Sequence, residues 1–109
     1  MKALITTLSK ILPIYPFEAP QGARVPYGIY VKSESAVRTK DGIVGTDGSV
    51  TISIYANTID AVEHIASQII TALDNTTLDG FSYYYEGANE ESYSDIGLIQ
   101  KDITFNILK

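Results

Sequence analysis

The sequence contains no cysteine and no tryptophan, and a single histidine among its 109 residues. The lack of cysteine excludes disulfides, thiolate metal sites and cysteine nucleophiles. Basic residues are also few, because 8 Lys and Arg stand against 13 Asp and Glu. The resulting net charge of -5 argues against broad binding to a nucleic-acid backbone, which depends on clustered cations.

Long apolar runs are missing as well. No uninterrupted stretch approaches the roughly 20 residues that a membrane-spanning helix requires. Thr6, Thr7, Ser9 and Lys10 interrupt the apolar start of the chain, and no small-residue cleavage pattern follows. We therefore expect a soluble protein that is made inside the cell, with no membrane partner.

What is present is an ordinary globular composition, with 45% hydrophobic and 19% charged residues. The length is close to the commonest size of one domain. We expect residues 1–109 to form a single domain that folds without metals or covalent cross-links.

The chain begins with a segment of helical spacing. The prediction is a short amphipathic helix that ends before Pro13, since proline lacks an amide donor and disfavours helix in the preceding residue. The apolar positions of this segment are Met1, Leu4, Ile5, Leu8, Ile11 and Leu12. The prolines and glycine of residues 14–26 predict an extended, loop-like connection.

Two strands are predicted next. In the first, Tyr27, Ile29 and Val31 alternate with more polar neighbours and are expected to face the core. Residues 39–48 contain two Asp-Gly pairs, which favour a flexible hairpin loop. The clearest strand follows over residues 50–56, where apolar residues alternate without interruption.

A long helix is expected from about Ile59 to Asp74, capped by Asn57 or Thr58. Its apolar stripe is the expected centre of the core, because each buried Ile or Leu contributes roughly 1.5 to 3 kcal/mol. The stripe consists of Val62, Ile65, Ala66, Ile69, Ile70 and Leu73.

Two more strands complete the prediction. One runs through Phe81, Tyr83 and Tyr85, and residues 86–95 are expected to form a loop. The other runs over residues 99–107, with Lys101 on its apolar face, where it lies near an edge or directs its charge outward. The predicted fold is α+β, in the order α-β-β-α-β-β, with an antiparallel sheet and two helices packed on one face.

Residues that could carry chemistry are scattered. His64 is expected on the solvent side of its helix, without the oriented partner that a catalytic base needs. The aspartates of the two Asp-Gly pairs, Asp41 and Asp47, are explained by turn formation. No glycine pattern matches a phosphate-binding loop. We therefore expect no catalytic residue, cofactor or metal site, and no enzyme activity.

An acidic group around residues 86–95 has two interpretations. Glu86, Glu90, Glu91 and Asp95 match no calcium-loop spacing, which favours a solvated acidic loop. The alternative is weak cation binding at a seam between subunits.

Tyrosine is the unusual enrichment, with eight residues against three Phe. Strand propensity accounts for many of them. The functional interpretation is an assembly interface, since aromatic residues are enriched where proteins meet. The candidate interface residues are Tyr30, Tyr55 and Tyr84, which are expected on the face opposite the core, and Ile43 and Val44 of the predicted hairpin loop.

The linear pattern resembles the phage tail-completion, or tail-to-head joining, proteins over nearly the whole chain. The matching pieces are IYPFEAPQGARVPYGIYV, AVRTKDG, SVTISIYANTIDAVEHIASQIITAL and SYSDIGLIQKDITFNI. Their order is more telling than any one of them. The family similarly has an opening helix, a first strand approached through prolines, a loop with glycines, a strand that leads into a long helix, and a closing strand.

The resemblance implies a structural subunit that forms a homo-oligomeric ring, a hexamer in this family, at the head-proximal end of the tail tube. The implied partners are further copies of the chain, the tail tube protein and the head-tail connector protein. The implied location is the virion tail, and the host bacterial cytoplasm during assembly. The extended loop would be residues 39–49, a candidate contact with a neighbouring subunit or the tube.

A different class of function is an alternative. A free-standing ligand-binding or regulatory α+β module would have a concave apolar pocket with a few convergent polar groups. Oligomeric rings would support the structural subunit, whereas a strict monomer that binds a metabolite would support the module.

Overall fold

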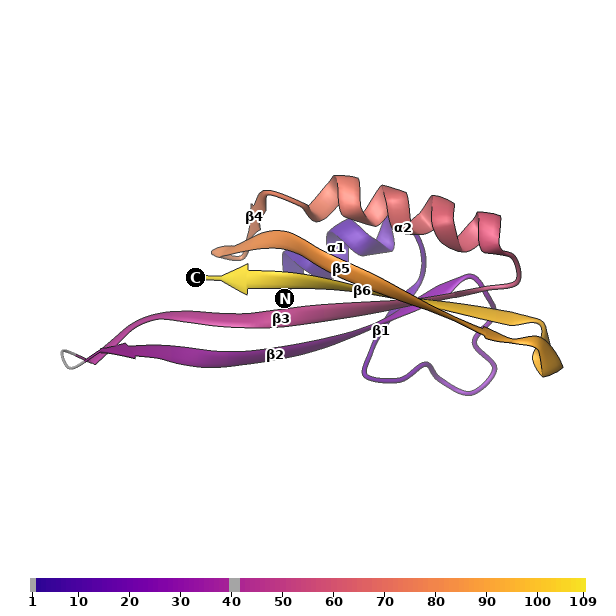
Figure 1. The fold of residues 1–109 in the computed structure, drawn as a ribbon, viewed down its shortest axis with the longest axis horizontal. Coiled ribbons are helices and arrows are strands. Elements are labelled where there is room, and N and C mark those ends of the chain that lie inside the picture. Colours follow the sequence, from indigo (N-terminus) through magenta and orange to yellow (C-terminus); the bar gives the residue numbers. More distant parts are fainter. Residues whose placement is uncertain (1, 40–41) are drawn as a thin grey trace.

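A computed structural model describes residues 2–39 and 42–109 of the chain. These residues form one six-stranded sheet with two α-helices on one of its faces (Figure 1). The elements in chain order are α1 (Lys2–Ser9), β1 (Ile14–Pro16), β2 (Tyr27–Thr39), β3 (Gly42–Ala56), α2 (Ile59–Leu73), β4 (Thr76–Leu78), β5 (Phe81–Tyr93), the 3-10 turn η1 (Ser94–Ile96) and β6 (Leu98–Leu108).

The strand order across the sheet is β1-β2-β3-β6-β5-β4. The four long strands β2, β3, β6 and β5 are all antiparallel to their neighbours, and β4 is antiparallel to β5. The short strand β1 pairs with β2 in parallel. The α+β class is therefore confirmed, whereas the prediction of a purely antiparallel sheet was wrong. The predicted order α-β-β-α-β-β was also wrong, because it lacks the two short strands β1 and β4.

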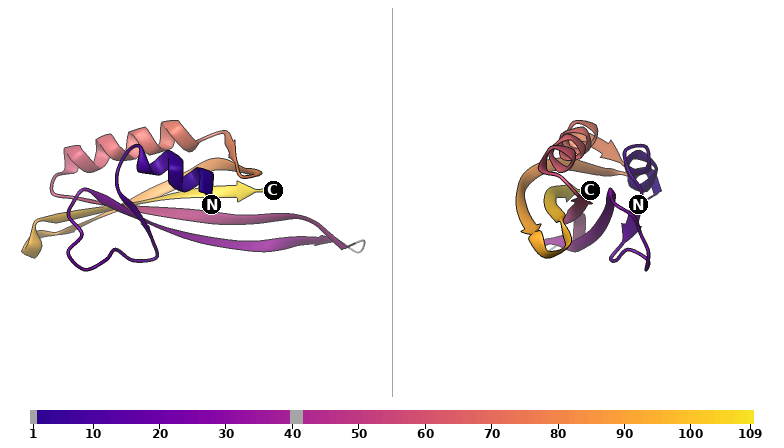
Figure 2. Two further views of the ribbon diagram at one scale, coloured as in Figure 1. Left: turned by 180° about the vertical axis from the view of Figure 1, so that it is seen from behind. Right: turned by 90° about the vertical axis from the view of Figure 1, so that its right-hand side faces the viewer.

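The core lies between the sheet and the two helices (Figure 2). From β3, the alternating residues of the predicted strand, from Val50 to Ala56, are buried as expected. The stripe of α2 is confirmed, with Ile69 fully buried and Ile70 packed against the core. The helix begins after Thr58, whose side chain accepts a hydrogen bond from the Ala61 amide at 3.1 Å.

The first helix is shorter than predicted. It ends at Ser9, although the chain continues in a turn that buries Leu12 before Pro13. Leu4 and Leu8 enter the core. The backbone amide of Ala3 at the start of α1 is bound by the Asp79 carboxylate at 2.9 Å, which fastens the helix to the turn between β4 and β5.

Two segments predicted as loops are instead strands. Residues 42–48 belong to β3 and pair with β2, and residues 86–93 belong to β5 and pair with β6. Gly48, from a predicted turn, lies inside β3, where a Cβ would collide with the backbone of Ser33 and Glu34 on β2. A glycine is required at this position because the two strands approach closely, and not because the chain turns there.

The predicted orientation of β2 was also wrong. Tyr30 pairs with Ile52 of β3 and packs against the core, whereas Val31 is exposed. Gly28, on the same face as Tyr30, is buried beneath Leu12 and Ile14, where a side chain would be too close. The core-facing residues of β2 therefore include a glycine, which carries no apolar signal in the sequence.

The molecule is elongated, with principal extents of 53 × 24 × 22 Å. At one end, β2 and β3 continue beyond the region that the helices cover and form a projecting hairpin (Figures 1 and 2). At the other end, β5, η1 and β6 form a second projection. We call these two parts the β2–β3 arm and the β5–β6 arm.

Candidate assembly surface

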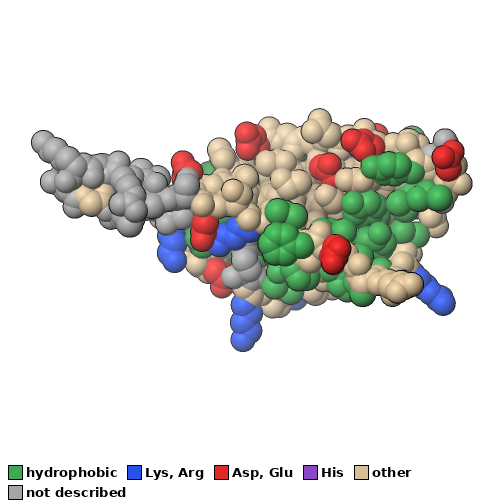
Figure 3. All heavy atoms as spheres, turned by 90° about the horizontal axis from the view of Figure 1, so that it is seen from below, with side chains coloured by type: hydrophobic (Ala, Val, Ile, Leu, Met, Phe, Trp, Pro, Cys, Tyr) green, Lys and Arg blue, Asp and Glu red, His purple; other side chains and the backbone are tan. Residues whose placement is uncertain are grey.

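The sheet face opposite the helices carries a cluster of tyrosines. Tyr27 of β2 stacks on Tyr55 of β3, with ring centroids 5.0 Å apart, and Tyr15 of β1 meets Tyr27 edge-on at 6.2 Å. Figure 3 views this face and shows hydrophobic side chains gathered away from the β2–β3 arm. Apolar side chains collected on one solvent-facing surface are typical of a site where proteins meet.

A polar network continues the same face across β6 to β5. Asp102 accepts hydrogen bonds from Ser53 at 2.6 Å and from the Gln100 amide nitrogen at 2.9 Å. The Tyr93 hydroxyl lies 3.0 Å from the Gln100 side-chain oxygen and 2.7 Å from Glu91. These bonds hold side chains from three strands in one arrangement, so the surface is ordered before any partner binds.

Charge and burial act together on the tyrosines of this face. Partial burial, followed by the charge of Asp102, raises the pKa of Tyr55. The hydrogen bond to Glu91 raises the pKa of Tyr93. A tyrosine hydroxyl is already protonated at neutral pH, and both shifts move its ionisation further from neutrality.

The candidate interface residues from the sequence divide into three groups. Tyr55 and Tyr84 lie on the face opposite the helices, as predicted, and Tyr84 is exposed. Tyr30 lies on the core face, so the prediction that it lies opposite the core was wrong. Ile43 and Val44 lie in β3 within the β2–β3 arm, but their side chains fall outside the described part of the structure.

Both edges of the sheet are only partly covered. On β2, the strand β1 pairs with residues 28–30, and no other strand of the described chain pairs with the edge beyond them. On β5, the strand β4 pairs with residues 81–83, and the Asp74 carboxylate accepts a hydrogen bond from the Tyr85 amide at 2.8 Å. Past that point no described strand pairs with the outer edge of β5. We call these two segments the open edges. Sequence reasoning missed this feature because β1 and β4 are too short to leave a periodic pattern.

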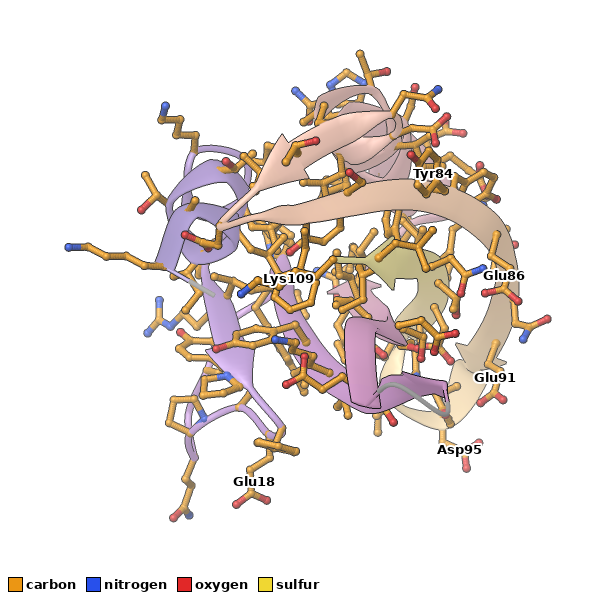
Figure 4. The ribbon with its side chains drawn as sticks, turned by 90° about the vertical axis from the view of Figure 1, so that its left-hand side faces the viewer. Glu18, Tyr84, Glu86, Glu91, Asp95 and Lys109 are labelled. Atoms are coloured by element: carbon orange, nitrogen blue, oxygen red, sulfur yellow. The ribbon has the colours of Figure 1, made fainter. Side chains whose placement is uncertain are left out.

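The acidic residues predicted in a loop lie along the β5–β6 arm. Figure 4 shows Glu86, Glu91 and Asp95 on the side of the molecule that β5 forms. Among the described residues, no group of three or more His, Asp or Glu could hold a metal ion. The cation-binding alternative gains no support from this arrangement.

Lys101 connects the long helix to this arm. Its ammonium group lies 2.7 Å from Glu63 of α2, so its charge is paired with an exposed carboxylate outside the core. The proposed edge position is wrong, because β6 lies between β3 and β5. The hydrogen bond from Lys101 lowers the pKa of Glu63, and the hydrogen bond with Glu63 raises the pKa of Glu90 on β5.

His64 is exposed on α2, as the helical spacing predicts. It lines a groove between the end of α1 and α2, together with Ile11, Ser67 and Gln68. The groove lies over the outward side of α2, and no hydrogen bond orients His64 in the described structure. No helix within residues 2–39 and 42–109 is long and apolar enough to cross a membrane.

Comparison with known proteins finds a likeness to solved structures. No protein-family model matches the chain, and no curated protein matches it. Among solved structures, the chain is similar to one described as the virion of a native gene transfer agent particle. The TM-score is 0.80 at 14% identity, and the match covers 98% of this chain and 91% of that one. At this identity the comparison establishes a shared fold.

Proposed function

We propose that the chain is a structural subunit of a bacteriophage or prophage tail, and that it performs no chemical step. Copies of it form a ring at the head-proximal end of the tail tube and join the tail to the head. The observation that carries the proposal is the likeness of nearly the whole fold to a virion chain. The sequence resemblance to tail-completion proteins, which rests on different information, points in the same direction.

The sheet edges and arms support assembly as the mechanism. An uncovered strand edge presents unpaired amide and carbonyl groups, which a strand of another chain satisfies. The β2–β3 arm projects from the helix-covered body, as a contact with a neighbouring subunit or the tube requires (Figure 1). Its apolar residues Ile43 and Val44 remain candidates for that contact.

The proposed partners are further copies of the chain, the tail tube protein and the head-tail connector protein. The ring has six members in the family that the sequence resembles, and we propose the same number here. A net charge of -5 favours passage of DNA through such a ring without adhesion. The proposed location is the virion tail, reached from the host cytoplasm.

Light scattering after size-exclusion chromatography, with negative-stain images, tests this proposal. Ring-shaped particles of uniform mass are the expected result, either from the chain alone or after addition of tail tubes. A chain that stays monomeric with and without tubes, and that binds a metabolite, would contradict the proposal. That result would instead support the alternative of a ligand-binding or regulatory module, for which the groove beside His64 is the site to examine.

A further inference from the structure

We propose that neighbouring copies join by pairing the open edge of β2 in one copy with the open edge of β5 in the next, antiparallel, with Val31 opposite Tyr93. This inference rests on the proposed function, because the ring needs a junction, and it specifies that junction. Four independent features of the sheet lead to it.

The first feature is the direction of the strands. Within the sheet β2, β3, β6 and β5 alternate in direction, so β2 and β5 run oppositely. When a second copy is placed beside the first by rotation about a ring axis, its β2 lies antiparallel to the first copy's β5. Antiparallel pairing is slightly more stable per residue than parallel pairing. The junction therefore continues the alternation of the sheet.

The second feature is which peptide groups point outward. On β2, the Gly28 amide binds Pro13 at 2.8 Å and the Tyr30 carbonyl binds the Phe17 amide at 3.0 Å. Outward peptide groups recur at every second residue of a strand. The outward groups after Tyr30 therefore belong to Lys32, Glu34 and residue 36.

On β5, the outward carbonyl of Tyr83 accepts from the Asn75 amide at 2.8 Å. The irregularity between Tyr85 and Gly87 shifts the alternation by one residue. Beyond it, the outward groups belong to Ala88, Glu90 and Ser92.

The third feature is the length of each open edge. In the proposed register, Ser92, Glu90 and Ala88 come opposite residues 32, 34 and 36, so every outward group meets another. The β1 strand blocks β2 up to Tyr30, which makes Val31 the first available position. At the far end, the β2 irregularity after Val37 coincides with the β5 irregularity before Gly87. Both regular segments therefore begin and end together.

The fourth feature is exposed apolar surface. Val31 and Tyr93 are 42% and 39% exposed, and the register makes them direct neighbours on one face. The same placement brings η1 of one copy toward the end of β1 in the next. There Ile96 is 71% exposed and Phe17 is 73% exposed, the two highest values among the large hydrophobic side chains described. One register thus places four exposed apolar side chains near partners.

Charge opposes one of the competing two-fold dimers. The β5 sequence carries three acidic residues and no basic one, whereas β2 carries two basic residues and one acidic. Two β5 edges would place like charges together, which opposes pairing of β5 with itself. The register sets Glu90 opposite Glu34, and Lys32, 3.1 Å from Glu34, is the cation that offsets this pair.

The register also implies a tilt. Within one copy, the pairing across the sheet links Glu90 of β5 through Lys101 and Ile54 to Gly28 of β2. At the junction Glu90 instead lies opposite residue 34 of the next copy, so the pairing is displaced by six residues along β2. At about 3.3 Å per residue this is about 20 Å, across four strands that span about 19 Å. The strands would tilt by about 45° from the ring axis, close to the roughly 35–45° of closed barrels. A head-to-tail junction closes into a ring when the rotation between neighbours divides a full turn, as it does for the six copies proposed.

Engineered disulfides test the junction, because the natural chain has no cysteine. Within one copy Val31 and Tyr93 are separated by three strand spacings and six residues, about 25 Å, too far for a disulfide. We expect the double variant Val31→Cys with Tyr93→Cys to form a covalent ladder up to a closed ring under mild oxidation. Each single variant should stay uncross-linked. Lys32→Cys with Tyr93→Cys, which places the thiols on opposite faces, is the matched control.

The outcomes separate the junction from the proposed function. A wild-type chain that forms rings while the double variant gives no ladder would overturn the junction and leave the ring intact. Dimers from Val31→Cys alone, in the amount that the double variant gives, would show two-fold pairing of β2 and also overturn it. If the wild-type chain never assembles, even with tail tubes, and no ladder forms, both proposals are contradicted.

Discussion

The helix-covered body and the two arms are built from the same strands, yet they are stabilised differently. Within the body, the core-facing side chains of β3 and β6 are fully or almost fully buried between sheet and helices. In the β2–β3 arm, the same strands continue without a helix above them, and backbone pairing between the two strands holds them (Figure 1). The β5–β6 arm is joined to α2 by the exposed ion pair between Lys101 and Glu63. The body can fold alone, whereas the arms expose surface that a second chain can cover.

The difference separates stability from assembly. Substitutions in the body should change the free energy of unfolding, while substitutions in the arms should change association and leave that free energy nearly unchanged. Four variants test this division, from the largest expected change in stability to the smallest.

Ile69→Asp should unfold the protein. Ile69 is fully buried in α2, so the substitution places an unpaired charge in the core, at a cost of at least about 4 kcal/mol. Thermal unfolding followed by circular dichroism measures the effect. The control is Thr71→Asp on the exposed side of the same helix, which should fold. An unchanged midpoint for Ile69→Asp would show that the buried face of α2 is misplaced.

Tyr83→Phe should make the body less sensitive to high pH. Burial, followed by the charge of Asp79, raises the pKa of Tyr83 to about 12 from an ordinary 10.0. A raised pKa gives stability that is present below pH 10 and is lost as the pH rises through about 12, here up to about 3 kcal/mol in total. Urea unfolding from pH 9 to 11.5 should show a smaller decline in the variant. Tyr84→Phe, on the exposed face, should decline like the wild type; equal declines in all three proteins would contradict the assignment.

Thr58→Ala should lower the free energy of unfolding by about 1 kcal/mol, because it removes the cap of α2. Asn57→Ala is the control, since Asn57 was the alternative cap and is exposed. Urea unfolding at neutral pH compares the two. A greater loss of unfolding free energy for Asn57→Ala than for Thr58→Ala would show that Asn57, and not Thr58, caps α2.

Replacing Ile43 and Val44 together with Ser should change the free energy of unfolding by less than about 0.5 kcal/mol and impair assembly. Both residues lie in the β2–β3 arm, away from the helix-covered core. Unfolding curves and light scattering make the measurement, and Gln68→Ser with Thr71→Ser on the exposed side of α2 is the control. Normal rings and normal particle completion by the arm variant would remove the arm from the assembly surface.

The sequence predicted the body far better than the arms. Residues 50–56 and the apolar stripe of α2 each have one buried face, so their apolar residues recur at the regular spacing of a strand or a helix. In the arms that face is solvent-exposed, and strand pairing rests on backbone bonds that any residue can make. The glycines of residues 39–48 and the acidic residues of 86–95 favoured loops in the sequence, but these segments largely belong to the strands β3 and β5.

The candidate surface was predicted in part for a related reason. Tyr55 and Tyr84 were placed on the correct face because their strands have buried neighbours of clear alternation. The prediction of which β2 residues face the core was wrong, because the core-facing side includes Gly28 and the aromatic Tyr27 packs on Tyr55 outside the core. The open edges could not be foreseen, since they depend on how far β1 and β4 extend along their neighbours.

Hydrogen exchange measured by mass spectrometry, on the chain before and after ring formation, tests the central claim most directly. Amides of β3 and β6 in the body should exchange slowly in both states. The outward amides of residues 32, 34 and 36 in β2 and of residues 88, 90 and 92 in β5 should exchange faster in the free chain and become protected in the ring. Rings whose two open edges exchange as fast as those of the free chain would contradict assembly through these edges.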